Sequence, residues 1–85
     1  MQTIKIIGIL IKDRIKEAGK TQVILSKYSH VIKSRFGYHE LSDEKCSRQA
    51  FMILNLAPDI DNQNALMEEL NTVGGIEVKD MVFNY

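Results

Sequence analysis

The side chains with the most distinctive chemistry in this chain are two arginines, one histidine and one cysteine. Arg14 follows Asp13 directly after an apolar run, and Arg35 stands two residues before Gly37. A guanidinium can hold a carboxylate through two parallel hydrogen bonds, so both arginines are suited to an anionic small molecule. We therefore take Asp13, Arg14, Arg35 and Gly37 as candidate ligand-binding residues. The alternatives are a surface ion pair of Arg14 with Asp13 or Glu17, and a solvated or interface position for Arg35.

A second hypothesis concerns His39 and Cys46, which are separated by the six residues 40–45. Imidazole and thiolate are ligands for nickel, copper or zinc, so the pair indicates a possible metal site in a hairpin. The alternative is a histidine at the edge of a loop and a half-buried cysteine, because free cysteine commonly packs as a small apolar residue. Beyond this pair we find no nucleophile next to a base and no glycine-rich phosphate cradle. We expect no catalytic residue, no enzymatic activity and no cofactor.

Length and charge restrict the class of protein. The 85 residues are enough for one domain, which we place at 1–85. Eleven basic and eleven acidic residues cancel. Proteins that bind nucleic acids carry a basic excess, so we expect no direct binding of nucleic acid. The single cysteine cannot form an internal disulfide, so we expect a reducing, cytoplasmic location. The apolar stretch 4–11 contains a lysine and is much shorter than the roughly 20 residues that cross a bilayer, so we expect no membrane association.

The zero net charge divides unevenly along the chain. Residues 1–39 contain eight basic and two acidic residues, whereas residues 40–85 contain three basic and nine acidic residues, giving +6 and −6. The basic residues are dispersed, as on solvated faces, rather than grouped in a run that would bind nucleic acid. We therefore expect the two halves to neutralise each other in the folded chain.

Apolar periodicity predicts six elements. Residues 3–11 are β-branched and nearly continuous in apolar character, which is typical of a central strand. Asp13 can cap a helix whose apolar face is formed by Ile15, Ala18, Leu25 and Tyr28, with Val23 and Ile24 beside them. A second helix begins after Asp61 or Asn62, carries the apolar stripe Leu66, Met67, Leu70 and Val73, and ends at Gly74 and Gly75, one of them left-handed. The other strands are expected over 30–39, where Gly37 indicates a bulge or close approach, 49–56 and 76–83.

The order strand, helix, strand, strand, helix, strand predicts an α+β, ferredoxin-like βαββαβ sandwich, similar to an ACT domain. Right-handed crossovers place both helices on one face of a four-stranded antiparallel sheet, with the basic helix beside the acidic one. The other sheet face is left uncovered although it carries apolar residues, and such a face usually indicates a partner. We expect a homodimer or homotetramer whose interface includes Met81, Phe83 and Tyr85.

Several segments in this order resemble a known family. They are residues 9–14, 23–28, 32–38 with Arg35 and Gly37, the strand before Pro58, and 74–79. Together they are similar to the small ACT-like regulators of the iron-only hydrogenase system. The resemblance implies a bacterial, cytoplasmic, non-catalytic regulatory module that binds a small ligand or a protein partner and has no DNA-binding domain. ACT domains typically bind amino acids near the loop after the first strand, which carries a glycine there; residues 12–15 of this chain contain none.

A more distant resemblance is to the sensor domain of nickel-responsive regulators, which has the same fold. That domain holds its metal with a His and a Cys at a spacing similar to that of His39 and Cys46. Another ligand of that family, a His two positions earlier, is replaced here by Gly37, and Ser26 stands where the first helix would supply a third His. Nickel sensing therefore remains an alternative function. A further alternative is a structural interaction module that binds no ligand.

Overall fold

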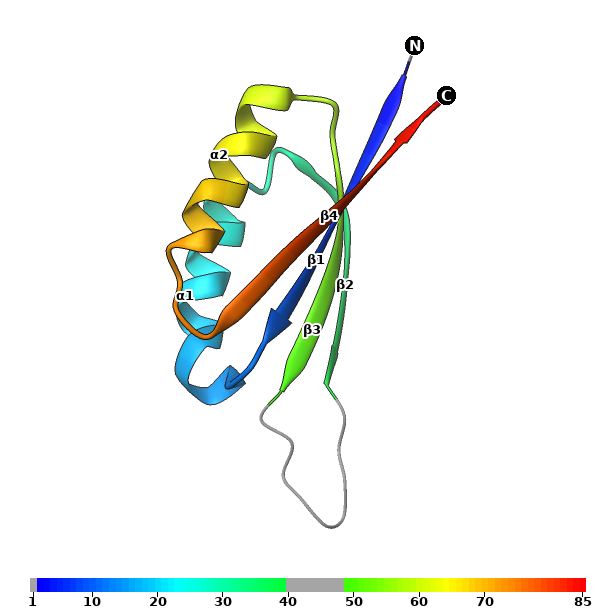
Figure 1. The fold of residues 1–85 in the computed structure, drawn as a ribbon. Helices are drawn as coiled ribbons and strands as arrows, with labels where there is room; N and C mark the ends of the chain where they lie inside the picture. The colour runs from blue at the N-terminus through cyan, green and yellow to red at the C-terminus, as the bar shows by residue number, and fades with distance from the viewer. Residues whose placement is uncertain (1, 40–48) are drawn as a thin grey trace.

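The computed structural model describes residues 2–39 and 49–85. Within them the chain forms four strands and two helices in the predicted order (Figure 1). Their bounds are β1 Thr3–Ile11, α1 Arg14–Lys27, β2 Ile32–His39, β3 Ala50–Leu56, α2 Ile60–Asn71 and β4 Ile76–Asn84. The predicted bounds are correct to within two residues at every strand end.

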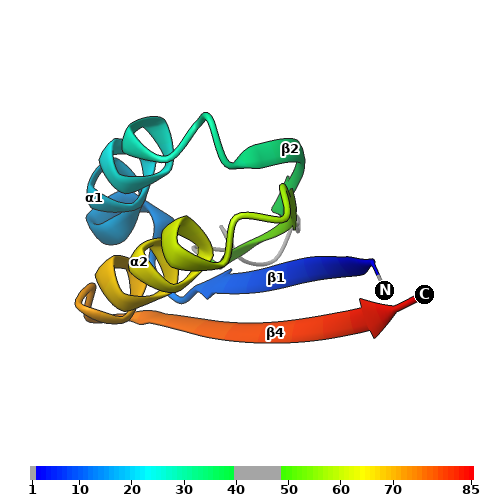
Figure 2. The ribbon, with the colours of Figure 1, turned by 90° about the horizontal axis from the view of Figure 1, so that it is seen from above.

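The four strands form one antiparallel sheet in the order β2-β3-β1-β4. β1 is central, and its Ile7 lies opposite Leu54 of β3 and Asp80 of β4. Both helices lie on the same side of this sheet (Figures 1 and 2). The structure thus confirms the α+β, ferredoxin-like fold. β1 and β4 also extend together beyond the helices, so the two termini lie close to each other (Figure 2).

The hydrophobic core lies between the sheet and the helices. Successive side chains of a strand point to opposite faces, so alternate residues of β1 and β3 turn toward the helices. From β1 these are Ile7, Ile9 and Ile11, which are almost fully buried. They pack with buried leucines and a valine from β3, α1, α2 and the start of β2, namely Leu54, Leu56, Leu25, Val31, Leu66 and Leu70.

Helix α1 begins as predicted, because the Asp13 carboxylate accepts hydrogen bonds from the backbone N–H groups of Ile15 and Lys16, at 3.1 and 3.4 Å. The predicted apolar face is only partly correct. Ile15 and Val23 are exposed, whereas the buried residues are Glu17, Thr21, Leu25 and Tyr28. These residues repeat at intervals of four, four and three, which is one stripe of an α-helix. The helix is therefore rotated relative to the expectation, and a glutamate and a threonine occupy its covered side.

Helix α2 begins two or three residues earlier than predicted, since the expected cap was Asp61 or Asn62. Its cap is Asp59, whose Oδ1 accepts from the backbone N–H of Asn62 at 3.2 Å and whose Oδ2 accepts from the Asn62 side chain at 2.6 Å. These two bonds hold the pKa of Asp59 below its ordinary value. The predicted stripe is confirmed for Leu66, Leu70 and Val73, which are buried. Pro58 and Asp59 thus form the entry to the helix.

The turn before β4 contains the left-handed glycine. It is Gly75, with φ of 81°, three residues beyond the C-cap Thr72 and thus not directly at the helix end as predicted. A Cβ at Gly75 would lie 3.1 Å from Cγ of the buried Glu17. The Gly75 carbonyl also accepts a hydrogen bond from the Lys12 backbone N–H at 2.9 Å. This turn therefore joins the start of α1 to the start of β4.

The basic helix lies beside the acidic helix, as predicted from the right-handed crossovers. Lys27 of α1 forms an ion pair with Glu69 of α2 at 3.1 Å, and the Tyr28 hydroxyl donates a hydrogen bond to the same carboxylate. The hydrogen bond from Tyr28, and to a lesser extent the one from Lys27, holds the pKa of Glu69 below its ordinary value. With 14 and 12 residues, neither helix in the described part of the chain is long and apolar enough to cross a membrane.

Candidate functional site

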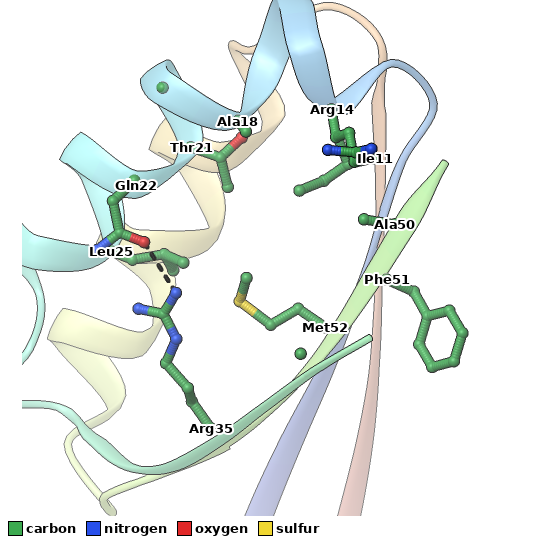
Figure 3. Close-up of a pocket in the computed structure, with 12 residues that line it drawn as sticks. Ile11, Arg14, Ala18, Thr21, Gln22, Leu25, Arg35, Ala50, Phe51 and Met52 are labelled. Carbon is green, nitrogen blue, oxygen red and sulfur yellow. Dashed lines mark hydrogen bonds between the residues drawn. The ribbon is translucent and has the colours of Figure 1, made fainter. Parts of the chain in front are cut away.

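A hollow of about 500 Å³ lies between α1 and the β2 and β3 end of the sheet (Figure 3). We call it the α1–β3 hollow. Helix α1 contributes Arg14, Ala18, Gly19, Thr21, Gln22 and Leu25. The sheet contributes Ile11, Arg35, Gly37, Ala50 and Met52, together with Phe51, whose ring points to the opposite side of β3 in Figure 3. A volume of this size is typical of sites for small molecules.

The hollow exists because small residues face it. Ala18 and Gly19 line it from α1, Gly37 from β2 and Ala50 from β3. A Cβ added at Gly19 or at Gly37 would meet no other atom within 4 Å. Gly37 pairs regularly with Met52, and the irregularity of β2 lies between Ile32 and Ser34, so the predicted bulge at Gly37 is wrong. The structure assigns this glycine to the wall of the hollow.

Arg35 is held in place at one side of the hollow. Its Nη2 donates a hydrogen bond of 2.8 Å to Oε1 of Gln22, as Figure 3 shows. The Gln22 amide in turn donates to the Ser26 hydroxyl at 3.3 Å. A guanidinium has five N–H donors, so this bond orients Arg35 and occupies one of them. Arg35 is thereby positioned beside the hollow although its side chain is largely exposed.

Arg14 lines the same hollow from the first residue of α1. Its neighbour Asp13 does not line the hollow, because its carboxylate caps the helix. Of the four predicted ligand-binding residues, the structure therefore brings Arg14, Arg35 and Gly37 together and places Asp13 at the helix start beside them. Gln22 and Met52 were missed by the sequence reasoning. Gln22 follows Arg14 and Ala18 at helical spacing, which is the signal that would have found it.

The electrostatics of the hollow favour an anion. Two guanidinium groups line it, and none of the described residues that line it is acidic. Its remaining surface is largely aliphatic, from Ile11, Leu25 and Met52. Charges act more strongly next to apolar side chains, where water screens them less, than they do in open solvent. The arrangement can bind a small molecule with one anionic group and an apolar body.

The predicted metal pair, His39 and Cys46, is not tested by the described residues. His39 is the last residue of β2, and Cys46 lies outside the described residues. Within residues 2–39 and 49–85 no group of three or more His, Cys, Asp or Glu side chains is placed to hold a metal ion. The metal hypothesis therefore stays a prediction.

The sheet face opposite the helices is the second feature of the surface. We call it the open face; it consists of the side of the sheet that neither α1 nor α2 covers (Figure 1). Phe36, Phe51, Ile53, Met81 and Phe83 lie on it with 42 to 60% of their surface exposed. Tyr85 follows β4 and is 67% exposed. The predicted interface residues are thus accessible on this chain.

The sequence matches no protein-family model and no curated protein. It is similar to the uncharacterized protein TM1266 from Thermotoga maritima, whose solved structure has a TM-score of 0.80 and 27% identity over 98% of this chain and 100% of that chain.

Two other solved structures share the fold at lower identity. CPII, a nitrogen regulatory PII-like protein from Thiomonas intermedia K12 bound to ADP, AMP and bicarbonate, has a TM-score of 0.60 and 13% identity, over 99% of this chain and 93% of that chain. A formyltetrahydrofolate deformylase from Pseudomonas putida KT2440 has a TM-score of 0.60 and 11% identity, over 96% of this chain but 29% of that chain. Because one fold serves many functions, these two likenesses concern the architecture alone.

Proposed function

We propose that this chain is a non-catalytic regulatory module that binds a small anionic ligand in the α1–β3 hollow and works as a self-associated unit. The observation that carries the proposal is the convergence of Arg14 and Arg35 on one hollow of about 500 Å³. The two arginines come from different elements, and each was a candidate for ligand binding on sequence grounds alone. Both side chains line this one hollow.

The ligand that fits best is a carboxylate with an apolar body. A carboxylate accepts two parallel bonds from a guanidinium, and such charge-assisted bonds contribute about 1.5–3 kcal/mol each. Arg35 is already oriented by Gln22, which lowers the entropy lost on binding. The apolar part of the ligand packs on Leu25 and Met52, while Gly37 leaves the room for it.

The regulatory part of the proposal has two supports. The resemblance to regulators of the iron-only hydrogenase system covers segments in all parts of the chain, and it implies a bacterial, cytoplasmic protein. CPII, which shares the fold, is a nitrogen regulatory protein whose structure holds ADP, AMP and bicarbonate. Regulators of this size act by changing state or partner on binding a ligand, so we place the chain in a regulatory complex rather than in a reaction.

Self-association is supported by the open face. Met81 and Phe83 lie on it and Tyr85 follows them, each at least half exposed. Exposed apolar patches of this kind mark interaction sites on small proteins. The proposed assembly is a homodimer or a homotetramer. The open face also favours the second candidate function, an interaction module that needs no ligand.

The test is a thermal-shift screen of carboxylates, amino acids, nucleotides, bicarbonate, Ni²⁺ and Zn²⁺ against the wild-type chain. A ligand at a hundred times its Kd stabilises the native state by about 2.7 kcal/mol, which raises Tm by roughly 10–20 °C in a domain of this size. Arg14→Ala and Arg35→Ala each weaken carboxylate binding by about 10- to 100-fold. Lys33→Ala is the matched control, because it removes a positive charge from β2 outside the hollow and leaves binding unchanged.

Four outcomes distinguish the candidates. A carboxylate shift that both arginine variants lose supports the proposal. A shift that neither variant changes places the ligand elsewhere and refutes the assignment to the α1–β3 hollow. No shift with any compound favours the interaction module, whereas a shift with Ni²⁺ or Zn²⁺ alone favours metal sensing by His39 and Cys46.

A further inference from the structure

Gly8 is an unexpected residue at the centre of the sheet. It lies in the middle of β1 between isoleucines, where a glycine weakens a strand because it has no side chain to pack and loses more entropy on folding. Its backbone does not require glycine, since Gly75 has the only positive φ among the described residues. A Cβ at Gly8 would meet only the Lys79 carbonyl oxygen, at an ordinary 3.9 Å. Nothing in the described part of the chain therefore explains the missing side chain.

The missing side chain does have an effect on the open face. Two hollows, of about 370 and 120 Å³, meet at Gly8 and both are lined by Lys79. The larger one is bordered by Leu10, Phe51 and Ile53, and the smaller one by Ile6 and Met81. Gly8 thus forms the floor of a trough between β3 and β4. A glycine in a strand often marks a place where another backbone or side chain approaches closely.

We infer that this trough, which we call the Gly8 trough, seats the open face of a second copy of this chain. The same face carries both the depression and the side chains that can fill one: Phe51, Ile53 and Met81 are 42, 44 and 57% exposed. A surface that carries both a depression and protruding side chains can be complementary to itself. In a two-fold symmetric interface each residue contact then occurs twice. The inference rests on the self-association in the proposed function and specifies where it occurs.

The charges beside the trough are also self-complementary. Glu77 lines the trough together with Lys79, and the two form an ion pair of 3.6 Å within the chain. Both are substantially exposed, so each can exchange its partner for the opposite charge of a second copy. In an assembly of two copies related by a two-fold axis, Glu77 of one chain can meet the partner's Lys79, and this contact then occurs twice. A partner surface that carries charges of one sign only would repel either Glu77 or Lys79.

The open face is of the right size for a dimer. Four strands spaced by about 4.8 Å and up to nine residues at about 3.4 Å each make a face of roughly 19 by 30 Å, before side chains add relief. A standard interface uses about 800 Å² of accessible surface from each partner. The flat face supplies roughly 570 Å² from each partner and side-chain relief adds to it, so covering the open face provides an interface near the lower end of the standard range and buries the apolar residues on it.

The deciding variant is Gly8→Val, examined by sedimentation equilibrium and by urea unfolding from low to high micromolar concentration. The Cβ of a valine at Gly8 meets no atom closer than 3.9 Å and its methyl groups fill the trough, so we expect the monomer to unfold at the same or a higher urea concentration. The dimer dissociation constant rises at least about tenfold, equivalent to about 1.4 kcal/mol. Gly74→Val is the matched control, since a Cβ there also meets nothing within 4 Å and its φ is not positive, but Gly74 lies in the turn before β4 and lines neither the Gly8 trough nor the α1–β3 hollow; it leaves association unchanged.

A second pair of variants tests the two-fold arrangement. Lys79→Glu weakens association because it opposes two acidic groups across the axis, and the double variant Glu77→Lys/Lys79→Glu restores it. A wild-type chain that stays monomeric at high micromolar concentration overturns the inference. So does a Gly8→Val chain that dimerises as tightly as wild type, which would point to an edge strand instead. Ligand binding at the α1–β3 hollow is measured separately by thermal shift, so either proposal can fail while the other stands.

Discussion

Replacing Gly75 by alanine tests how the turn before β4 holds the start of α1. Gly75 has a φ of 81°, a conformation that costs an L-residue about 1–2 kcal/mol. The new methyl group would also lie 3.1 Å from Cγ and 3.2 Å from Oε1 of Glu17. Glu17 is only 4% exposed, so its side chain has little room to move away.

The expected magnitude follows from three effects. The backbone conformation contributes about 1–2 kcal/mol of destabilisation, and one overpacked methyl about 1 kcal/mol. Alanine also reduces the entropy of the unfolded chain, which returns about 0.4–1 kcal/mol to the folded state. We therefore expect Gly75→Ala to lower the free energy of unfolding by roughly 1–2.5 kcal/mol.

Urea unfolding followed by circular dichroism measures this change as a lower midpoint at constant m-value. Gly74→Ala is the matched control, because the adjacent glycine has no positive φ and a Cβ there meets nothing within 4 Å. It is expected to be neutral or to stabilise by up to about 1 kcal/mol. A cycle with Glu17→Ala isolates the contact, since removing the Glu17 side chain relieves the crowding but not the backbone cost.

Two results would refute the reasoning. One is a Gly75→Ala chain as stable as wild type, which would mean that the turn adjusts freely. The other is a Gly74→Ala chain that loses as much stability as Gly75→Ala, which would make the effect a general one of the turn. If the free-energy changes of Glu17→Ala and Gly75→Ala simply add, the proposed crowding between the two residues is refuted, but the backbone cost at Gly75 is not.

Three further predictions concern the helices. Asp13→Ala removes the cap of α1 and lowers the free energy of unfolding by about 1 kcal/mol, measured by urea unfolding; an unchanged midpoint would contradict the capping role. Leu66→Ala empties a fully buried position and costs about 2–5 kcal/mol, seen as a lower Tm, and a loss below 1 kcal/mol would mean the core is loosely packed. The pKa of Glu69 is lowered by bonds from Tyr28 and Lys27, so its contribution to stability is present above its ordinary pKa of 4.5 and disappears as the pH falls through the lowered value. The unfolding midpoint of Glu69→Gln should therefore depend less on pH than that of wild type between pH 6 and 3, and parallel pH profiles would count against this.

The order of the elements and the side of the sheet that each helix covers follow from local sequence patterns. The nearly continuous apolar run 3–11 and the helical spacing around Leu66 and Leu70 are local patterns, and right-handed crossovers leave few ways to arrange them. The predicted crossovers place the basic helix beside the acidic one, and the ion pair of Lys27 with Glu69 confirms that contact. Asp13 was identified as a cap because capping depends only on the next three residues.

The buried side of α1, and the hollow that remains between α1 and β3, depend on contacts between elements that are distant in sequence. The stripe with Ile15 and the stripe with Thr21 both satisfy helical spacing, and packing against β1 and α2 selects the second. That rotation turns Arg14, Ala18 and Gln22 toward β2 and β3, where Arg35 and Gly37 complete the α1–β3 hollow. Such a hollow is a property of residues distant in sequence, because it depends on which small side chains face each other across two elements, and no local pattern encodes that.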